Sequence, residues 1–441
     1  MQAFCLLTAK LIPEPKGDII TPSMLDIKFI RENPSLVSKS AASKNYPVDI
    51  DHLLEIDRAY IELVQKVQVL REERNAFTKE IKGKPTDEQL VKGKELREKL
   101  EKQENGLAAL KEELDMLAMQ IANTAKSDVK VGKNDTENDV VRKHKTPTSF
   151  SFTPKDHVVL GEMLDIIDIE RATKVSGARF AYLKNEGALL EFALVQLAFE
   201  TLIKEGFTPI LPPVLIKTET MRGMGYMEHG GDEDMFQVTK DDLVLVGTAE
   251  HAVVPMHKDE VFEKKDLPKR YVGFSPAFRR EAGSYGKDTK GIIRVHQFDK
   301  VEMVSYVPQG DDDREHEYFV SLEEKFFQML DIPYQVIKMC TGDLGFPTAR
   351  KYDIEAWVPS QEKYREVTSA STITDFQSRR LNIKYQDGPE KKYVNILNGT
   401  AFAIGRTLVA ILENYQQEDG SVVIPEVLRK YIGKEKITSK K

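Results

Sequence analysis

Apolar residues recur at spacings of three and four along two long stretches near the start of the chain. In residues 56–81 the recurring positions are Ile56, Tyr60, Leu63, Val67, Leu70, Phe77 and Ile81. In residues 96–121 they are Leu96, Leu100, Leu107, Leu110, Leu114, Leu117 and Ile121. This spacing places each set on one side of an α-helix and predicts two helices with coiled-coil seams. Gly83 and Pro85 interrupt the pattern, so we expect an antiparallel hairpin that projects on the order of 45 Å.

The segments on either side of this hairpin are shorter and more polar. Residues 25–50 predict a small helical cap, in which Pro34 ends a first helix. The first 23 residues have too short an apolar run for a signal peptide, and they lack arginine, which favours a flexible extension over a targeting segment. The expected parts are the extension (1–23), a helical domain (24–127), a polar linker (128–148) and a larger mixed domain (149–441).

Polar and apolar residues alternate between residues 274 and 303, where the sequence predicts two strands joined by a glycine-rich loop at 282–291. We expect the first strand to end at Glu281, with Arg279 and Glu281 on one face. We expect the second strand to begin at Ile292, with these side chains on one face: Arg294, His296, Phe298, Lys300 and Glu302. On the opposite face we expect Ile293, Val295, Val301 and Met303. The polar face is either a solvated surface or a platform for a ligand.

The rest of the larger domain predicts a mixture of helices and strands. Residues 189–205 form an apolar helix, and a strand with a proline turn follows at 206–213. Residues 353–357 predict another strand. Residues 395–415 predict a strand, a turn of small residues and a helix, with Arg406 at the start of that helix. Because a helix N-terminus attracts anions, Arg406 marks a candidate phosphate site.

Composition narrows the possible functions. The chain has 441 residues, a formal net charge of −7 and two cysteines, Cys5 and Cys340. Two cysteines cannot form a disulfide framework or a zinc cluster, so we expect a reducing compartment and no zinc. The net charge predicts no bulk attraction to nucleic acid, and any RNA contact would depend on local basic patches. The sequence contains no long apolar run, so we expect no membrane segment.

The residues of the predicted β-hairpin resemble a known signature. Phe278, Arg279 and Glu281, the variable loop, then Arg294 and Phe298 resemble motif 2 of the class II aminoacyl-tRNA synthetases. The full run from 281 to 303 resembles the seryl-tRNA synthetase version, and that likeness extends over most of the chain from Met24 onward. Residues 189–213 resemble motif 1, and residues 395–415 resemble motif 3.

The resemblance implies a fold and a reaction. The fold is α+β: a class II synthetase antiparallel sheet flanked by helices, with an N-terminal antiparallel coiled-coil arm. The reaction is a serine–tRNA ligation, in which ATP and L-serine form seryl-adenylate and the seryl group passes to tRNA(Ser). Whether tRNA(Sec) is also charged stays open. The resemblance further implies binding of tRNA by the arm, a homodimer, a cytoplasmic location and Mg²⁺ held through ATP.

The same resemblance assigns site residues. The catalytic residues are Arg279 and Arg406. The serine-binding residues are Thr248, Ala249, Glu250, Arg279, Glu302 and Thr400. The ATP-binding residues are Arg279, Arg280, Glu281, Val295, Phe298, Glu366, Val367, Thr368, Ser369 and Arg406, with Glu366 and Ser369 also contacting the metal. Two positions depart from the family pattern: Arg280, whose parity predicts packing away from Arg279, and Thr400, which replaces a serine.

Local composition gives weaker support to these assignments. Thr248 and Glu250 could be no more than a helix N-cap, and basic residues at the hairpin tip alternate with acidic ones. Two alternatives therefore stay open. A tRNA-independent adenylating ligase of the same fold is disfavoured by the complete arm. A non-catalytic RNA-binding paralogue is disfavoured by the intact Arg279, Glu281 and Glu366.

Overall fold

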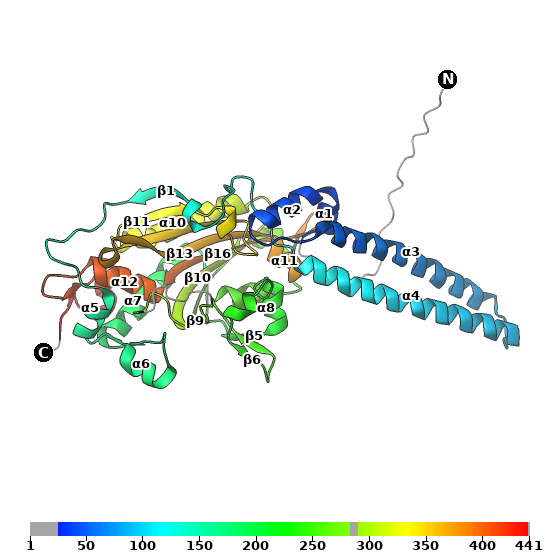
Figure 1. Cartoon of the computed structure of the whole chain (residues 1–441), viewed down its shortest axis with the longest axis horizontal. Helices are drawn as coiled ribbons and strands as arrows, with labels where there is room; N and C mark the ends of the chain where they lie inside the picture. The colour runs from blue at the N-terminus through cyan, green and yellow to red at the C-terminus, as the bar shows by residue number, and fades with distance from the viewer. Residues whose placement is uncertain (1–24, 283–289, 440–441) are drawn as a thin grey trace, which may run out of the picture.

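The N-terminal part of the molecule is a helical unit with a projecting arm (Figure 1). The structure, a computed structural model, describes residues 25–282 and 290–439. Two short helices, α1 (Ile27–Glu32) and α2 (Pro34–Ser43), precede the arm, and Pro34 begins the second helix as well as following the first. The arm consists of α3 (Ile50–Glu80) and α4 (Asp87–Met119), which lie side by side and antiparallel. The predicted helical hairpin is confirmed.

The hairpin is closed by a well-defined turn and by contacts between its helices. Thr86 caps α4: its hydroxyl accepts from the backbone N–H of Gln89, whose side chain accepts from the backbone of Thr86. Such a capping box fixes where a helix begins. Farther along, the Arg71 and Glu104 side chains form an ion pair across the two helices at 2.8 Å. Because two helices alone bury little surface, only some seam residues, such as Val67 and Leu100, are fully buried.

An eight-stranded sheet forms the centre of the larger domain. The strands run in the order β1 (Asp139–His144), β11 (Tyr334–Lys338), β12 (Arg350–Val358), β13 (Lys363–Thr374), β16 (Asn395–Ala403), β10 (Gln297–Val307), β9 (Lys269–Phe278) and β4 (Thr208–Ile210). Neighbouring strands are antiparallel, except that β4 pairs with β9 in parallel. This is the predicted α+β sheet.

Smaller elements surround this sheet. The helices are α5 (His157–Met163), α6 (Ile169–Ser176), α7 (Asn185–Lys204), α8 (Thr218–Met224), α9 (Glu250–Val253), α10 (Asp312–Met329), α11 (Phe376–Arg380), α12 (Ile404–Asn414) and α13 (Glu426–Ile432). The short strands are β2 (Ile167–Asp168), β3 (Tyr182–Leu183), β5 (Leu215–Lys217), β6 (Gln237–Val238), β7 (Leu243–Leu245), β8 (Val261–Glu263), β14 (Lys384–Asp387), β15 (Glu390–Tyr393), β17 (Val422–Val423) and β18 (Lys436–Ile437). None of the described helices is long and apolar enough to cross a membrane.

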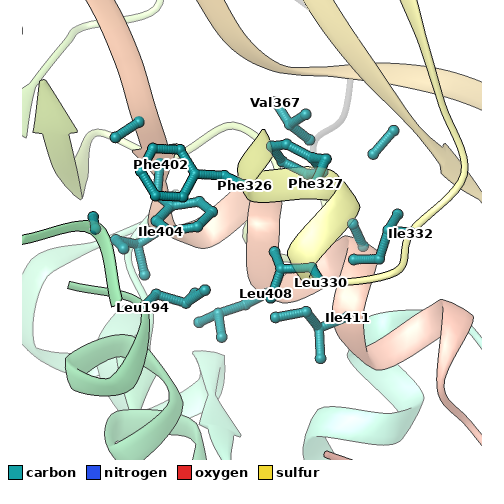
Figure 2. Close-up of a cluster of buried hydrophobic side chains, with 14 of the residues drawn as sticks. Leu194, Phe326, Phe327, Leu330, Ile332, Val367, Phe402, Ile404, Leu408 and Ile411 are labelled. Carbon is teal, nitrogen blue, oxygen red and sulfur yellow. The ribbon is translucent and has the colours of Figure 1, made fainter. Parts of the chain in front are cut away.

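One face of the sheet is covered by helices α7, α10 and α12, which build the main core. Figure 2 shows Leu194 of α7, Phe326 and Phe327 of α10, and Leu408 of α12 meeting in this core. Strand β10 presents Val301 and Met303 to the same cluster, as alternation predicts. Burial of these large apolar side chains supplies most of the driving force for this layer.

The other face of the sheet is divided between a second core and an open region. Val304 and Tyr306 of β10 pack with Ala249 and Val253 in this second core. Toward the start of β10, Lys300 and Glu302 point to the same side but line a cavity. The alternation along β10 thus leaves a polar hollow beside a packed apolar layer.

Strand boundaries differ from the prediction around the hairpin loop. Strand β9 ends at Phe278 and β10 begins at Gln297, so Glu281 and residues 292–296 lie outside the strands. Gly291 has a φ of 79°, and the Ile292 N–H points to His157 Nε2 at 3.4 Å instead of to β9. The predicted second strand is therefore five residues too long. Most of the predicted loop lies outside the described residues.

Two polar segments are more ordered than their composition suggests. The stretch predicted as a linker, 128–148, contains β1, which pairs with β11 along the outer edge of the sheet; the linker prediction is wrong over that strand. At the C-terminal end, residues 436–437 form β18, which pairs with β17; Ile437 is buried, whereas the residues on either side of it are exposed. Exposed strands of this kind have the composition of a loop, because most of their side chains face solvent.

Buried polar groups join the helical unit to the larger domain. Lys44, the C-cap residue directly after α2, is 1% exposed and donates from Nζ to the carbonyls of Asn123, Phe346 and Thr348 at 3.0, 3.0 and 2.8 Å. Arg380 of α11 donates to the carbonyl of Met119, at the end of α4, at 3.3 Å. These bonds satisfy carbonyls that burial would otherwise leave without donors.

Candidate active site

A cavity of about 400 Å³ occupies the open part of the second sheet face. Strands β9, β10, β13 and β16, the short helix α9 and the start of α12 surround it. The predicted site residues that line it are Thr248, Glu250, Arg279, Glu281, Val295, Phe298, Glu302, Glu366, Val367, Thr368, Ser369, Thr400 and Arg406. These residues are separated by up to 158 positions in sequence, so the sheet is what brings them together.

Two predicted residues do not line the cavity. Ala249 is fully buried in the second core, where it packs with Val253. Arg280 points away from Arg279: its Nε donates to the carbonyl of Met235 at 2.9 Å, and its guanidinium lies 4.9 Å from the Phe236 ring centroid. This is the packing role that its parity predicted. Val367, in contrast, does line the cavity, but its side chain also belongs to the apolar core in Figure 2.

Arg279 follows directly after β9 and has a fixed orientation. Its backbone N–H donates to the carbonyl of His296 at 3.0 Å, and its Nε donates to the carbonyl of Gly247 at 3.1 Å. The guanidinium carbon lies 5.3 Å from the Phe298 ring centroid, a cation–π distance. One edge of the guanidinium is thus used to hold its position, and the side chain lines the cavity beside Phe298.

Glu281 lies at the wall of the cavity next to Phe298. Its Oε2 accepts from Arg294 Nη1 at 2.5 Å. Glu281 lies three residues beyond the end of β9 in a left-handed conformation, with a φ of 55°, and its side chain lines the cavity. Ile293 and Val295 also line the cavity. The prediction that they face away from it is wrong because residues 292–296 are not in a strand.

One end of the cavity is rich in buried carboxylates. Glu302 is 1% exposed, and its Oε2 lies 2.5 Å from Lys300 Nζ and 3.4 Å from the Thr400 hydroxyl. Glu250 is 3% exposed, and its Oε1 accepts from the Tyr226 hydroxyl and from Gln377 Nε2, both at 3.0 Å. Burial, opposed by the Gln377 hydrogen bond, raises the pKa of Glu250 to about 7. This end suits a small polar ligand with a positive charge.

The other end pairs a carboxylate with cations. Glu366 Oε1 lies 3.0 Å from Arg406 Nη1. Burial would raise the pKa of Glu366, but Arg406, Lys351 and Arg279 outweigh it and hold that pKa at about 2. Lys351 in turn lies 3.2 Å from Asp353 Oδ2. The excess of cations over carboxylates facing this end suits a polyanion such as a triphosphate.

The oxygen atoms at this end also fit a magnesium ion carried by a nucleotide. Glu366 and Ser369 both line the cavity and offer hard oxygen ligands. Within 25–282 and 290–439 there is no cluster of three or more His, Cys, Asp or Glu that could hold a metal alone. Mg²⁺ commonly uses one or two protein oxygens together with substrate phosphates and water, which this arrangement could provide.

Several residues in the cavity or directly behind it had no signal in the sequence. Tyr226 and Gln377 are 24 and 127 positions away from Glu250 and meet it only in the fold. Lys351 of β12 and Asn398 of β16 also line the cavity, and neither residue was singled out from the sequence. Lys300 alone could have been found, because alternation already placed it beside Glu302.

The larger domain belongs to a known class. Residues 234–415 match the family model described as the tRNA synthetase class II core domain (G, H, P, S and T). That range contains all of the cavity-lining candidates and most of the central sheet. The fold of the larger domain is therefore that of a class II aminoacyl-tRNA synthetase core.

The other comparisons identify the family within that class. Residues 24–125 match the model of the seryl-tRNA synthetase N-terminal domain. The serine–tRNA ligase of Dictyoglomus thermophilum is 44% identical over 425 residues, covering 95% of this chain and all of the relative. The chain belongs to the seryl-tRNA synthetase family, the serine–tRNA ligases.

Solved structures agree with this assignment. The crystal structure of seryl-tRNA synthetase from Pyrococcus horikoshii complexed with ATP has a TM-score of 0.88 and 41% identity, and covers 95% of this chain and all of that one. The cytoplasmic serine–tRNA ligase of Naegleria fowleri in complex with AMP has a TM-score of 0.84 and 31% identity, covering 95% of this chain and 99% of that one. The likeness extends over the arm as well as the catalytic domain.

Proposed function

We propose how this chain performs serine–tRNA ligation with the residues of its cavity. In the first step the carboxylate of L-serine attacks the α-phosphate of ATP and pyrophosphate leaves. In the second step a terminal ribose hydroxyl of the tRNA attacks the seryl-adenylate and AMP leaves. Both steps need positioning and charge neutralisation more than a protein nucleophile.

The observation that carries this proposal is the place of Arg279 between the two ends of the cavity. Its positive charge acts on Glu366 at the cationic end and on His251 and Tyr226 beside the carboxylate end. A guanidinium in this place can contact the serine carboxylate and the α-phosphate together. Its fork of donors suits an oxyanion whose charge grows in the transition state.

The carboxylate end takes the amino acid. Glu250 and Thr248 contact the ammonium of serine, and Glu302 and Thr400 lie around the hydroxyl end of the substrate. Such a buried polar pocket rejects analogues that lack the hydroxyl, because its own groups would be left without partners. Thr400 keeps a hydroxyl at its position, and its extra methyl narrows the pocket.

The cationic end takes ATP. Phe298 stacks on the adenine ring and Glu281 accepts from the adenine amino group, while Val295, Val367 and Thr368 line the nucleotide. Arg406, at the start of α12, contacts the γ-phosphate, where the helix N-terminus adds to its charge. Glu366 and Ser369 would hold a Mg²⁺ ion that arrives with ATP. When bound, that ion neutralises the charge of the phosphate oxygens.

The tRNA is bound by the arm, and two subunits act together. The basic residues of the arm tip contact the phosphate backbone of the tRNA, and recognition rests on the shape of tRNA(Ser).

The exposed apolar residues for a subunit interface are Leu189, Phe192 and Ile203 of α7, together with Leu211, which follows β4. An exposed apolar set of this kind suits a homodimer interface. The tRNA then extends from the arm of one subunit to the cavity of the other. The enzyme acts in the cytoplasm.

Serine-dependent exchange of pyrophosphate into ATP tests the first step, and charging of a tRNA pool tests the second. Threonine, alanine and cysteine serve as control amino acids. We expect both activities with serine alone. Exchange without charging would favour the tRNA-independent ligase, and absence of exchange would favour the RNA-binding paralogue. Separate transcripts of tRNA(Ser) and tRNA(Sec) then show which tRNAs are charged.

A further inference from the structure

Two side chains from distant parts of the chain meet on the carboxylate of Glu250. Tyr226 follows α8, and its hydroxyl donates to Glu250 Oε1 at 3.0 Å and lies 3.3 Å from Oε2. Gln377 belongs to α11 and donates from Nε2 to Oε1 at 3.0 Å. Both donors therefore converge on the same oxygen. Glu250 is held on one side by these neutral groups and faces the cavity with the rest of its carboxylate.

The amide of Gln377 can work in one orientation only. Its Nε2 also faces the carbonyl of Met224 at 3.3 Å, so turning the amide over would place Oε1 against two acceptors. The side chain is fully buried, and Oε1 has no hydrogen-bond partner among the described residues. Leaving a buried oxygen without a partner is unfavourable. Gln377 therefore keeps its Nε2 donor on Glu250 although its Oε1 has no hydrogen-bond partner among the described residues.

The charged groups around Glu250 leave it without a direct cation. Lys300, on β10, lies 2.5 Å from Glu302, and neither Lys300 nor Arg279 comes within ion-pair distance of Glu250 in the described part of the chain. His251, its neighbour on α9, accepts from the Gly247 N–H at 3.1 Å, and burial lowers the pKa of His251 to about 3, so it is neutral near pH 7. A buried carboxylate with neutral donors behind it and a cavity in front suits an incoming cation.

We infer that Tyr226 and Gln377 are positioning residues that keep Glu250 ionised and aimed at the ammonium group of serine, so that they set the pH below which serine binding fails. This inference rests on the proposed placement of serine at Glu250. Hydrogen bonds to a carboxylate favour its charged form, and Glu250 must be charged to attract an ammonium. The two donors therefore act on substrate affinity through Glu250, without contacting the reacting atoms.

Because the pKa of Glu250 is raised to about 7, changes in its charge occur near neutral pH, where serine binding can be measured. Burial is the main cause of the raised pKa, and the negative charge of Glu302 adds to it. Gln377, Lys300 and Tyr226 oppose it. Removing either donor should raise that pKa further. Glu250 would then take up a proton at higher pH, and the affinity for serine would fall first on the acidic side.

The test uses Tyr226→Phe and Gln377→Met, which remove the donors and keep most of the volume. A hydrogen bond to a charged group corresponds to roughly a ten- to hundredfold change in affinity. We expect the KM for serine in pyrophosphate exchange to rise by about that factor at pH 7, with kcat and the KM for ATP changed less than about twofold. The acidic limb of kcat/KM for serine should move up by about one to two pH units, with partial recovery at pH 9.

Two variants with the same side-chain changes control for the loss of a hydrogen bond elsewhere. Tyr271→Phe removes a buried hydroxyl that contacts His257 at 2.9 Å, and Gln335→Met removes an amide that donates to Glu355 at 2.7 Å. Both should keep the wild-type pH profile. If Tyr226→Phe and Gln377→Met instead lower kcat/KM equally at every pH, their role is structural and the inference is wrong.

Glu250→Gln separates this inference from the proposed function. If Glu250→Gln keeps the wild-type KM for serine, the assignment of serine to this carboxylate fails. If Glu250→Gln loses serine affinity while Tyr226→Phe and Gln377→Met leave both KM and pH profile unchanged, only the positioning role is overturned. The positioning role is supported if both Tyr226→Phe and Gln377→Met raise the KM for serine and also shift the acidic limb of kcat/KM for serine to higher pH.

Discussion

The ammonium group of Lys44 donates a hydrogen bond of 3.0 Å to the backbone carbonyl of Phe346. The first residue directly follows the small N-terminal helices, and the second belongs to a loop whose neighbours Gly345 and Thr348 line the cavity. Lys44 has no carboxylate partner among the described residues, and three backbone carbonyls accept hydrogen bonds from its ammonium group. The junction between the two domains is thus held by a buried cation.

Replacement of Lys44 should change how stability depends on pH. Burial lowers the pKa of Lys44 to about 7, below its usual value of about 10.4. Between these values the unfolded chain holds more protons, so the free energy of unfolding rises with pH. Lys44→Met removes this dependence but leaves three carbonyls without a donor. At pH 9 we expect the free energy of unfolding of Lys44→Met to be about 2 kcal/mol lower than that of the wild type. At pH 7 we expect this difference to be smaller by a similar amount, because the wild type loses stability as the pH falls from 9 to 7.

Urea denaturation of both proteins at the two pH values measures this difference. Lys39→Met, at an exposed position of the preceding helix α2, is the matched control and should follow the wild type at both. A gap between Lys44→Met and wild type that stays constant from pH 7 to pH 9 would contradict the lowered pKa.

Arg279→Ala should abolish adenylate formation without unfolding the chain. The Arg279 side chain donates to the Gly247 carbonyl and contacts Phe298, so its removal should lower the melting temperature by only a few degrees. Without the main positive charge beside the attacking carboxylate and the α-phosphate, pyrophosphate exchange should slow by at least about a hundredfold. Its neighbour Arg280→Ala, whose side chain packs on Phe236, should keep exchange near wild type. Wild-type exchange in Arg279→Ala would refute the site.

Glu366→Gln should make activity depend more strongly on magnesium. The change replaces a proposed carboxylate ligand of the metal by a neutral amide and removes the negative charge that pairs with Arg406 at 3.0 Å. We expect the Mg²⁺ concentration for half-maximal exchange to rise about tenfold, with the KM for ATP rising in parallel. Glu355→Gln is the control, because Glu355 pairs in register with Glu366 across β12 and β13 but does not line the cavity. An unchanged Mg²⁺ requirement in Glu366→Gln would argue against its metal role.

Neutralising the arm tip should affect charging but not activation. Lys82, Lys84 and Lys99 are exposed, and their joint replacement by Ala should raise the KM for tRNA on the order of tenfold. The slope of log KM against log salt should fall by about 0.7 to 0.9 for each phosphate that the variant no longer neutralises. Removal of the nearby Glu80, Glu88 and Glu95 is the opposite control and should not weaken tRNA binding. If both triple variants charge tRNA alike, the tip does not contact the phosphate backbone.

Periodic patterns gave the most reliable predictions from sequence. The apolar seams at 56–81 and 96–121 follow helical spacing, and the helical hairpin of α3 and α4, with 31 and 33 residues, is confirmed. Alternation along β10 correctly separated Lys300 and Glu302 from Val301 and Met303. Both patterns depend on regular backbone geometry, which the sequence expresses directly. Roles assigned through the family resemblance remain proposals, although most of those residues share one cavity.

The failures occur where the backbone leaves regular structure or where a contact spans the chain. Residues 292–296 have strand-like composition, but Gly291 and His157 divert them into a cavity wall. Edge strand β1 is polar because nearly all of its side chains are exposed, so it resembled a linker. Tyr226 and Gln377 carry no local signal at all, because only the tertiary fold brings them to Glu250.

The place of β1 in the sheet also has a consequence for synthesis on the ribosome. The two arm helices follow each other directly, so the arm can fold as soon as residue 119 has left the exit tunnel. Asp139 of β1, made next, pairs with Lys338 of β11, which is translated 199 residues later. The outer strand of the sheet must therefore wait without a partner while most of the catalytic domain is made. During that interval its open edge is the part of the nascent chain most exposed to wrong pairing and to chaperones.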